Sequence, residues 1–143
     1  MHVNKLILIA LAAVILLGVL TTVWASRRTE AVFNGTIAIT FTQTTDPTPK
    51  ITVTDPADVR RFIGTLHLTP ATGPSGKRSL HAAIFEKPTG RVEVSFDSTR
   101  FYVHGAKALD IPAVEWGYST PKEFCLEFHK LTVNQTNANW IEP

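Results

Sequence analysis

The most reactive pair of side chains in this sequence is a cysteine and a histidine four residues apart. Cys125 and His129 lie in the segment EFCLEFHK, and residues four apart on a helix share a face. Thiolate catalysis would need His129 to lower the pKa of Cys125, and a third group to orient the histidine. The sequence marks no such group, and Phe124 and Phe128 place Cys125 beside an apolar stripe. We therefore expect Cys125 to be a small buried hydrophobe, and we assign no catalytic residue.

The remaining histidines could bind a metal ion only if the fold brought them together. His67, His81 and His104 show no recognised metal-ligand spacing, and Cys125 with His129 would supply only two ligands. His81 and His104 both lie on expected strands and could be neighbours. The acidic residues form no signature for paired acid and base catalysis. We predict neither a metal site nor a cofactor.

The segment ATGPSGKR, residues 71–78, comes close to a phosphate-binding loop. Gly76 and Lys77 are in place, but Arg78 stands where a magnesium-binding Ser or Thr is required. A phosphate-binding loop also follows a strand and opens a helix, whereas this segment follows a predicted helix and opens a predicted strand. We interpret it as an ordinary Gly- and Pro-rich loop.

One loop has the composition of a binding surface. In VEWGYS, residues 114–119, Trp116 and Tyr118 flank Gly117 ahead of the last predicted helix. Exposed aromatic side chains are frequent anchors for protein partners. Alternatively, the two rings close the edge of the core. Trp116 and Tyr118 are the only candidate partner-binding residues that the sequence indicates.

These residues must be positioned by short strands and two amphipathic helices. Apolar residues alternate with polar ones in most of the expected strands, which is typical of half-buried strands. The segment 80–86 is nearly continuous in apolar character, so we expect it to be central. The expected strands are residues 36–41, 50–54, 80–86, 91–96 and 100–105, with 111–114 as a possible further strand.

Both helices are marked by their first residues. Asp55 and Pro56 begin a helix expected to reach Leu68, with an apolar stripe that includes Phe62. Thr120 begins the second helix as the N-cap of a capping box, and Phe128 lies on its stripe. The resulting order, β-β-α-β-β-β-α, predicts an α+β fold in which two helices pack on an antiparallel sheet of about five strands.

The charge of the domain argues against a nucleic-acid partner. The chain has 14 basic and 12 acidic residues, and three basic and one acidic residue precede Val32. Eleven of each sign therefore remain, and they form no cluster of cations that would displace counterions from phosphates. Cys125 is the only cysteine, so the fold must hold without an intrachain disulfide.

The N-terminal segment is apolar enough to enter a membrane. Residues 6–20 carry no polar side chain, and residues 21–25 extend the run to twenty, enough for a helix to cross the hydrocarbon core. Small residues at Val23 and Ala25 favour cleavage of a signal peptide after Ala25. Trp24 and the following arginines instead favour a retained anchor. A retained anchor could leave the domain outside the cytoplasm or, alternatively, inside it.

These observations divide the chain into residues 1–28, an anchor or signal peptide, and residues 29–143, one small extracytoplasmic domain. We expect a membrane-anchored or exported binding or interaction domain, of which an accessory or inhibitory subunit at the membrane is one form. Its candidate partners are the membrane, through the N-terminal helix, and a protein. The alternative is a small extracytoplasmic enzyme or a ligand carrier with a cleft between the sheet and the helices.

Overall fold

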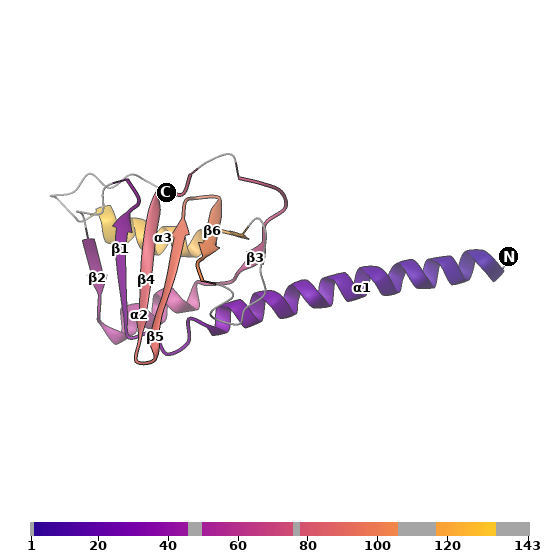
Figure 1. Ribbon diagram of the computed structural model, residues 1–143, viewed down its shortest axis with the longest axis horizontal. Coiled ribbons are helices and arrows are strands. Elements are labelled where there is room, and N and C mark those ends of the chain that lie inside the picture. The colour runs from indigo at the N-terminus through magenta and orange to yellow at the C-terminus, as the bar shows by residue number, and fades with distance from the viewer. Residues whose placement is uncertain (1, 46–49, 76–77, 106–116, 134–143) are drawn as a thin grey trace.

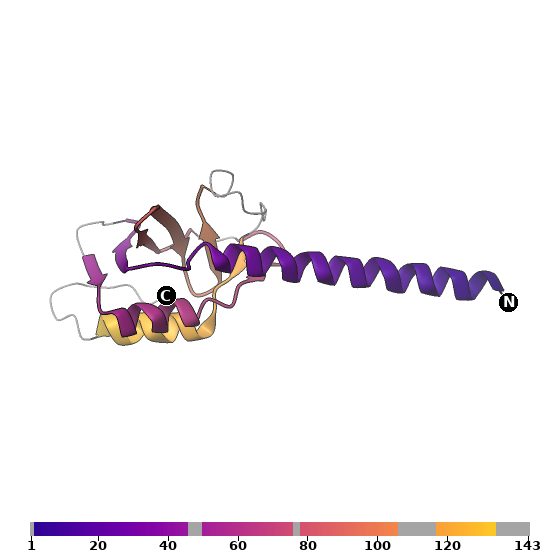
Figure 2. The same cartoon turned by 90° about the horizontal axis from the view of Figure 1, so that it is seen from below.

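One long helix, α1 (His2–Ala31), projects from a body that consists of a sheet and two shorter helices (Figure 1). This computed structural model describes residues 2–45, 50–75, 78–105 and 117–133. The sheet is antiparallel throughout, and both shorter helices lie side by side on one of its faces (Figure 2). The predicted α+β class is therefore confirmed.

Within the described residues, the sheet contains seven strands in the order β2-β1-β4-β5-β6-β7-β3. The predicted hairpin of the first two strands and the predicted three-strand meander are both present. β4 pairs with a neighbour on each side, as expected for a central strand. The strands are β1 (Ala38–Gln43), β2 (Lys50–Val53), β3 (Thr69–Pro70), β4 (His81–Lys87), β5 (Gly90–Phe96), β6 (Arg100–Val103) and β7 (Tyr118–Ser119).

Two of the seven strands were not predicted. β3 and β7 have two residues each and pair with each other, with Pro70 opposite Tyr118. Two residues are too few to show the alternation of a strand, and β3 contains a proline. The sequence analysis therefore predicted no strand in either segment. The possible strand at 111–114 lies outside the described residues.

The first short helix, α2 (Pro56–Gly64), begins where the sequence predicts and ends earlier. The Asp55 carboxylate accepts the backbone N–H groups of the second and third residues that follow it, at 2.9 and 3.0 Å. The helix stops at Gly64, with Thr65 as its C-cap, and not at the predicted Leu68. Glycine has a low helix propensity, and Leu66 and Leu68 beyond it are buried without being helical.

The second short helix, α3 (Lys122–Val133), starts differently from the prediction. The Thr120 hydroxyl, expected to cap this helix, instead donates to the carbonyl oxygen of Asp97 at 2.7 Å. The first helical hydrogen bond runs from the N–H of Cys125 to the carbonyl of Pro121, at 3.2 Å. Thr120 thus ties the start of α3 to the turn between β5 and β6, a long-range contact that a local capping pattern does not reveal.

The core between the sheet and the helices is built from phenylalanine. All eight phenylalanines of the chain are buried, so the predicted burial of Phe62 and Phe128 is confirmed. The ring of Phe96 lies 5.1 Å from that of Phe124 and 5.2 Å from that of Phe128, both edge-to-face. Aromatic pairs in this geometry stabilise a core beyond the area that they bury. The other buried phenylalanines are Phe33, Phe41, Phe85 and Phe101.

Candidate functional site

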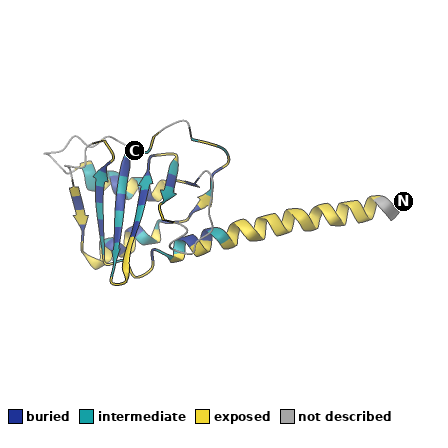
Figure 3. Cartoon of the chain, in the orientation of Figure 1, coloured by how far each residue is buried: buried dark blue, intermediate teal, exposed yellow. Residues whose placement is uncertain are grey.

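Helix α1 passes without a break from a fully exposed segment into the body of the protein. Its side chains are exposed from Asn4 to Trp24, whereas Ser26 and Thr29 are buried (Figure 3). The exposed part is long and apolar enough to be a membrane span or a signal peptide. The last turns of α1 therefore belong to the folded domain, and the junction between the two parts lies near Ala25.

The junction contains a buried polar contact. The Thr29 hydroxyl lies 2.6 Å from the phenolic oxygen of Tyr118 in β7. Thr29 also donates to the carbonyl oxygen of Ala25, so its hydroxyl hydrogen points along the helix and Tyr118 donates to Thr29. Burial raises the pKa of Tyr118, although the hydrogen bond to Thr29 acts in the opposite direction.

Two further polar contacts and one contact between aromatic rings hold the end of α1 and the residues after it. The Glu30 carboxylate accepts the backbone N–H of Leu68 at 2.7 Å, and the Lys87 ammonium donates to the carbonyl oxygen of Val32 at 2.8 Å. Directly after the helix, Phe33 is fully buried with its ring 4.8 Å from that of Phe85. Together with the contact to Tyr118 in β7, these contacts join the end of α1 to the segment at Leu68, to β4 and to β7, so the helix direction is set by the fold.

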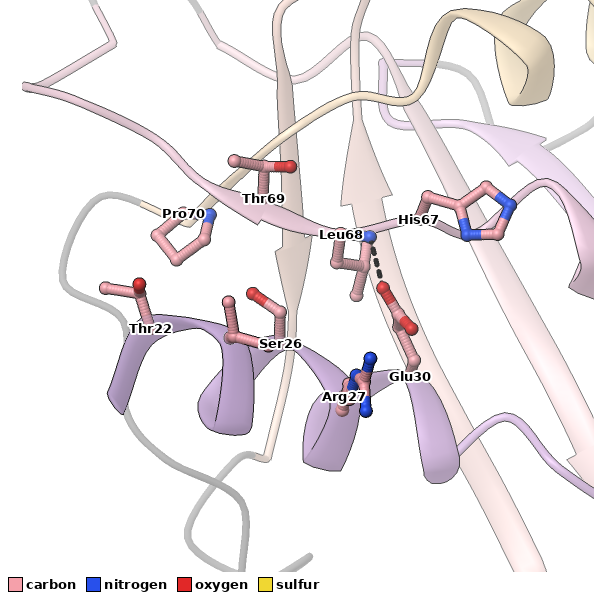
Figure 4. A pocket seen from close by; sticks show the side chains of 9 residues that line it. Thr22, Ser26, Arg27, Glu30, His67, Leu68, Thr69 and Pro70 are labelled. Carbon is pink, nitrogen blue, oxygen red and sulfur yellow. Dashed lines mark hydrogen bonds between the residues drawn. The ribbon is translucent and has the colours of Figure 1, made fainter. Parts of the chain in front are cut away.

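A cleft of about 310 Å³ lies beside this junction. One wall is the C-terminal end of α1, and the other is the segment 67–70 that includes β3 (Figure 4). Ser26 and Glu30 point from the helix toward that segment (Figure 4). The cleft mixes charged and hydroxyl side chains with apolar ones: Thr22, Val23, Ser26, Arg27, Glu30, His67, Leu68, Thr69 and Pro70.

The two arginines at this end of α1 have different surroundings. Arg28 lies over the Trp24 ring, with its guanidinium carbon 5.2 Å from the ring centroid. This is a cation–π contact, and neither Trp24 nor Arg28 lines the cleft. Arg27 lines the cleft and is exposed, and no described residue forms a hydrogen bond or ion pair with its guanidinium.

Of the two aromatic residues that the sequence indicates as partner-binding candidates, the structure describes only Tyr118. Tyr118 is 3% exposed and belongs to the core, as the second interpretation of this loop expects. It does not offer an exposed ring to a partner. Trp116 lies outside the described residues, so its role as a partner-binding residue stays a prediction.

The candidate nucleophile lies in surroundings that do not favour a thiolate. Burial raises the pKa of Cys125, and the nearby negative charge of Asp97 raises it further. A raised pKa keeps the thiol protonated near neutral pH and lowers its reactivity. Cys125 is half-buried, and not fully buried as expected.

The histidines are not gathered into one site. His81 is fully buried beside Phe128, on the helix-covered face of the sheet. His104 lies 2.8 Å from the Ser95 hydroxyl, and Ser95 belongs to the opposite face because the adjacent Phe96 points into the core. The two histidines expected as possible neighbours are thus on opposite faces. Among the described residues, no three His, Cys, Asp or Glu side chains lie close enough together to hold a metal ion.

The sequence analysis missed the contribution of α1 to the domain. Ser26, Thr29, Glu30 and Phe33 are spaced at i, i+3, i+4 and i+7, which is the spacing of one helix face. Three of the four residues are polar, so the stripe carries little hydrophobic signal beside the apolar run that precedes it. The expected boundary after residue 28 falls inside this stripe.

No protein-family model, curated protein or solved structure matches this chain.

Proposed function

We propose that this protein is a membrane-anchored binding domain that α1 holds outside the cytoplasm and close to the bilayer surface. The observation that carries the proposal is the position of the junction in α1. Residues 6–24 are exposed and almost entirely apolar, and the helix becomes buried immediately after them. Nineteen helical residues span about 28 Å, close to the roughly 30 Å of the hydrocarbon core.

The residues at the junction support retention of the helix. Trp24 and Arg28 form the kind of aromatic and cationic pair that settles at the headgroup level. The peptide bond after Ala25, where a signal peptidase would cut, lies within a continuous helix whose next residue is buried. Cleavage there would also separate Thr29 from its acceptor at Ala25.

Binding is favoured over catalysis by the contents of the domain. The space between the sheet and the helices, where a carrier would hold its ligand, is filled by phenylalanine rings. The pKa of Cys125, the single cysteine of the chain, is raised, which does not favour a nucleophilic thiolate. The cleft beside α1 combines charged and apolar walls, which is the composition of a binding site.

Accessibility from outside the cell tests the topology. Two variants, Asn4→Cys and Arg60→Cys, place one thiol near the start of α1 and one on exposed α2, each in a Cys125→Ala background. In intact cells, a membrane-impermeant maleimide should label position 60 and not position 4. The reverse pattern would place the domain in the cytoplasm. A mature protein that begins at Ser26 would show that the anchor is removed.

A further inference from the structure

The cleft beside α1 would open at the surface of the membrane if α1 is the retained anchor. Thr22 and Val23, in the last turns of the exposed apolar segment, line its outer part. Arg27 and Glu30 line the part beyond Trp24, toward the domain. A ligand in this cleft would therefore touch both the apolar end of the span and the charged residues that follow it.

The cleft offers one cationic and one anionic group. The Arg27 guanidinium has no hydrogen bond or ion pair within the described part of the chain, so its donors are available to a ligand. Planar guanidinium groups bind phosphate through paired hydrogen bonds.

Glu30 supplies the opposite charge in a fixed position. One carboxylate oxygen accepts the N–H of Leu68, and this bond holds the side chain across the cleft (Figure 4). Within residues described by the structure, the other oxygen has no hydrogen bond or ion pair. It can therefore accept a hydrogen bond from a cationic donor.

We infer that this cleft binds the headgroup of a zwitterionic phospholipid that carries a phosphate and a primary ammonium. Arg27 binds the phosphate and Glu30 accepts hydrogen bonds from the ammonium. The apolar residues Val23, Leu68 and Pro70 contact the glycerol and the first acyl carbons. A volume of about 310 Å³ lies at the lower end of the range of small-molecule sites, which suits a headgroup. The inference rests on the proposed anchoring of α1.

The pairing of charges separates this ligand from other lipids. A trimethylammonium headgroup has no N–H to donate to Glu30, and an anionic glycerol headgroup places no cation beside it. Phosphatidylethanolamine satisfies both Arg27 and Glu30. Loss of one hydrogen bond between charged groups lowers affinity by about tenfold or more.

The test uses the full chain in vesicles of phosphatidylcholine alone, with added phosphatidylethanolamine, or with added phosphatidylglycerol. Flotation reports membrane insertion, and native mass spectrometry after gentle detergent extraction reports the retained lipid. The wild-type protein should float in all three vesicles and retain phosphatidylethanolamine about tenfold over either other lipid. A protein that does not float contradicts the proposed anchoring. One that floats without this selectivity contradicts only the headgroup site.

Three variants assign the roles of the charges. Arg27→Gln should abolish lipid retention, and Arg60→Gln, which lies exposed on α2 and outside the cleft, should leave it unchanged. Glu30→Gln keeps an oxygen for the N–H of Leu68, so it should fold normally and lose only the preference for phosphatidylethanolamine over phosphatidylcholine. An unchanged preference in Glu30→Gln would overturn the ammonium assignment. Soluble phosphoethanolamine, added in detergent, should compete weakly, and binding of this compound without binding of the lipid would overturn the lipid assignment.

Discussion

The two parts of α1 form one helix and lie in different surroundings. From Leu6 to Trp24 the side chains are almost entirely apolar and exposed, and none of them is buried by the protein. From Ser26 to Glu30 the helix is largely polar, yet Ser26 and Thr29 are buried. Apolar residues are usually inside and polar ones outside a soluble protein, and the exposed apolar part is long and apolar enough to be a membrane span or a signal peptide. In the second part, the Thr29 hydroxyl contacts Ala25 and Tyr118 and the Glu30 carboxylate accepts the N–H of Leu68, whereas Arg27 and Arg28 are exposed.

The comparison predicts that truncation of a large side chain lowers domain stability at the buried end of α1 and not in its exposed apolar part. Phe33→Ala, directly after α1, should destabilise the domain by about 3–5 kcal/mol, because it leaves a cavity beside Phe85. Leu16→Ala, in the exposed apolar part, should leave domain stability unchanged. Denaturant unfolding of the full chain in detergent measures both. Equal effects would show that the two parts are not separate.

A pair of glycine variants tests how closely β7 packs against β6. This packing places Tyr118 against α1. Gly117 and Gly105 both have a φ of 72°, where a side chain is strained. A Cβ at Gly117 would also lie 2.7 Å from the Tyr102 ring, whereas one at Gly105 meets no atom of the described residues within 4 Å. Gly105→Ala should cost about 1 kcal/mol. Gly117→Ala should cost roughly 2–3 kcal/mol because the clash adds to the strain. Thermal unfolding that ranks the two variants equally would contradict the close packing.

Two threonines on α1 sharpen the comparison within a single residue type. Thr29 and Thr21 both donate to a backbone carbonyl of the helix, at Ala25 and Gly18, but only Thr29 also contacts Tyr118. Thr29→Val keeps the shape and leaves the buried Tyr118 hydroxyl without this partner, so it should cost about 1–2 kcal/mol. Thr21→Val should change domain stability by less than about 0.5 kcal/mol. The difference between their unfolding midpoints is the measurement, and no difference would mean that the buried contact contributes nothing.

The sequence predicted what depends on local pattern and missed what depends on long-range contact. The alternation of Val92, Val94 and Phe96 located a strand, and Asp55 with Pro56 located a helix start, because each signal lies within a few residues.

β3 and β7 escaped prediction because each depends on a partner about fifty residues away in sequence. The candidate cleft escaped for the same reason. Its two walls, the end of α1 and the segment 67–70, are brought together by contacts such as that of Glu30 with Leu68, which no spacing in the sequence indicates.

The smallest expected effect is a dependence of stability on alkaline pH at the junction. Burial raises the pKa of Tyr118 in the folded protein above its value in the unfolded chain. At high pH the unfolded state therefore loses its proton first, and stability falls as pH rises through the two values. The contribution is fully present below the unfolded value of about 10 and is lost above the folded one.

Unfolding free energies of the full chain, measured from neutral pH to above pH ~10, test this expectation for Tyr118. The Cys125 thiol, whose pKa is also raised, would lower stability in the same direction, so all proteins carry Cys125→Ala. Tyr118→Phe should be less stable at neutral pH, because the contact with Thr29 is lost, and its stability should decline less at high pH. If the two pH profiles run parallel, Tyr118 does not titrate differently in the folded protein. The buried contact with Thr29 would then not isolate the end of α1 from water, in contrast to the junction described here.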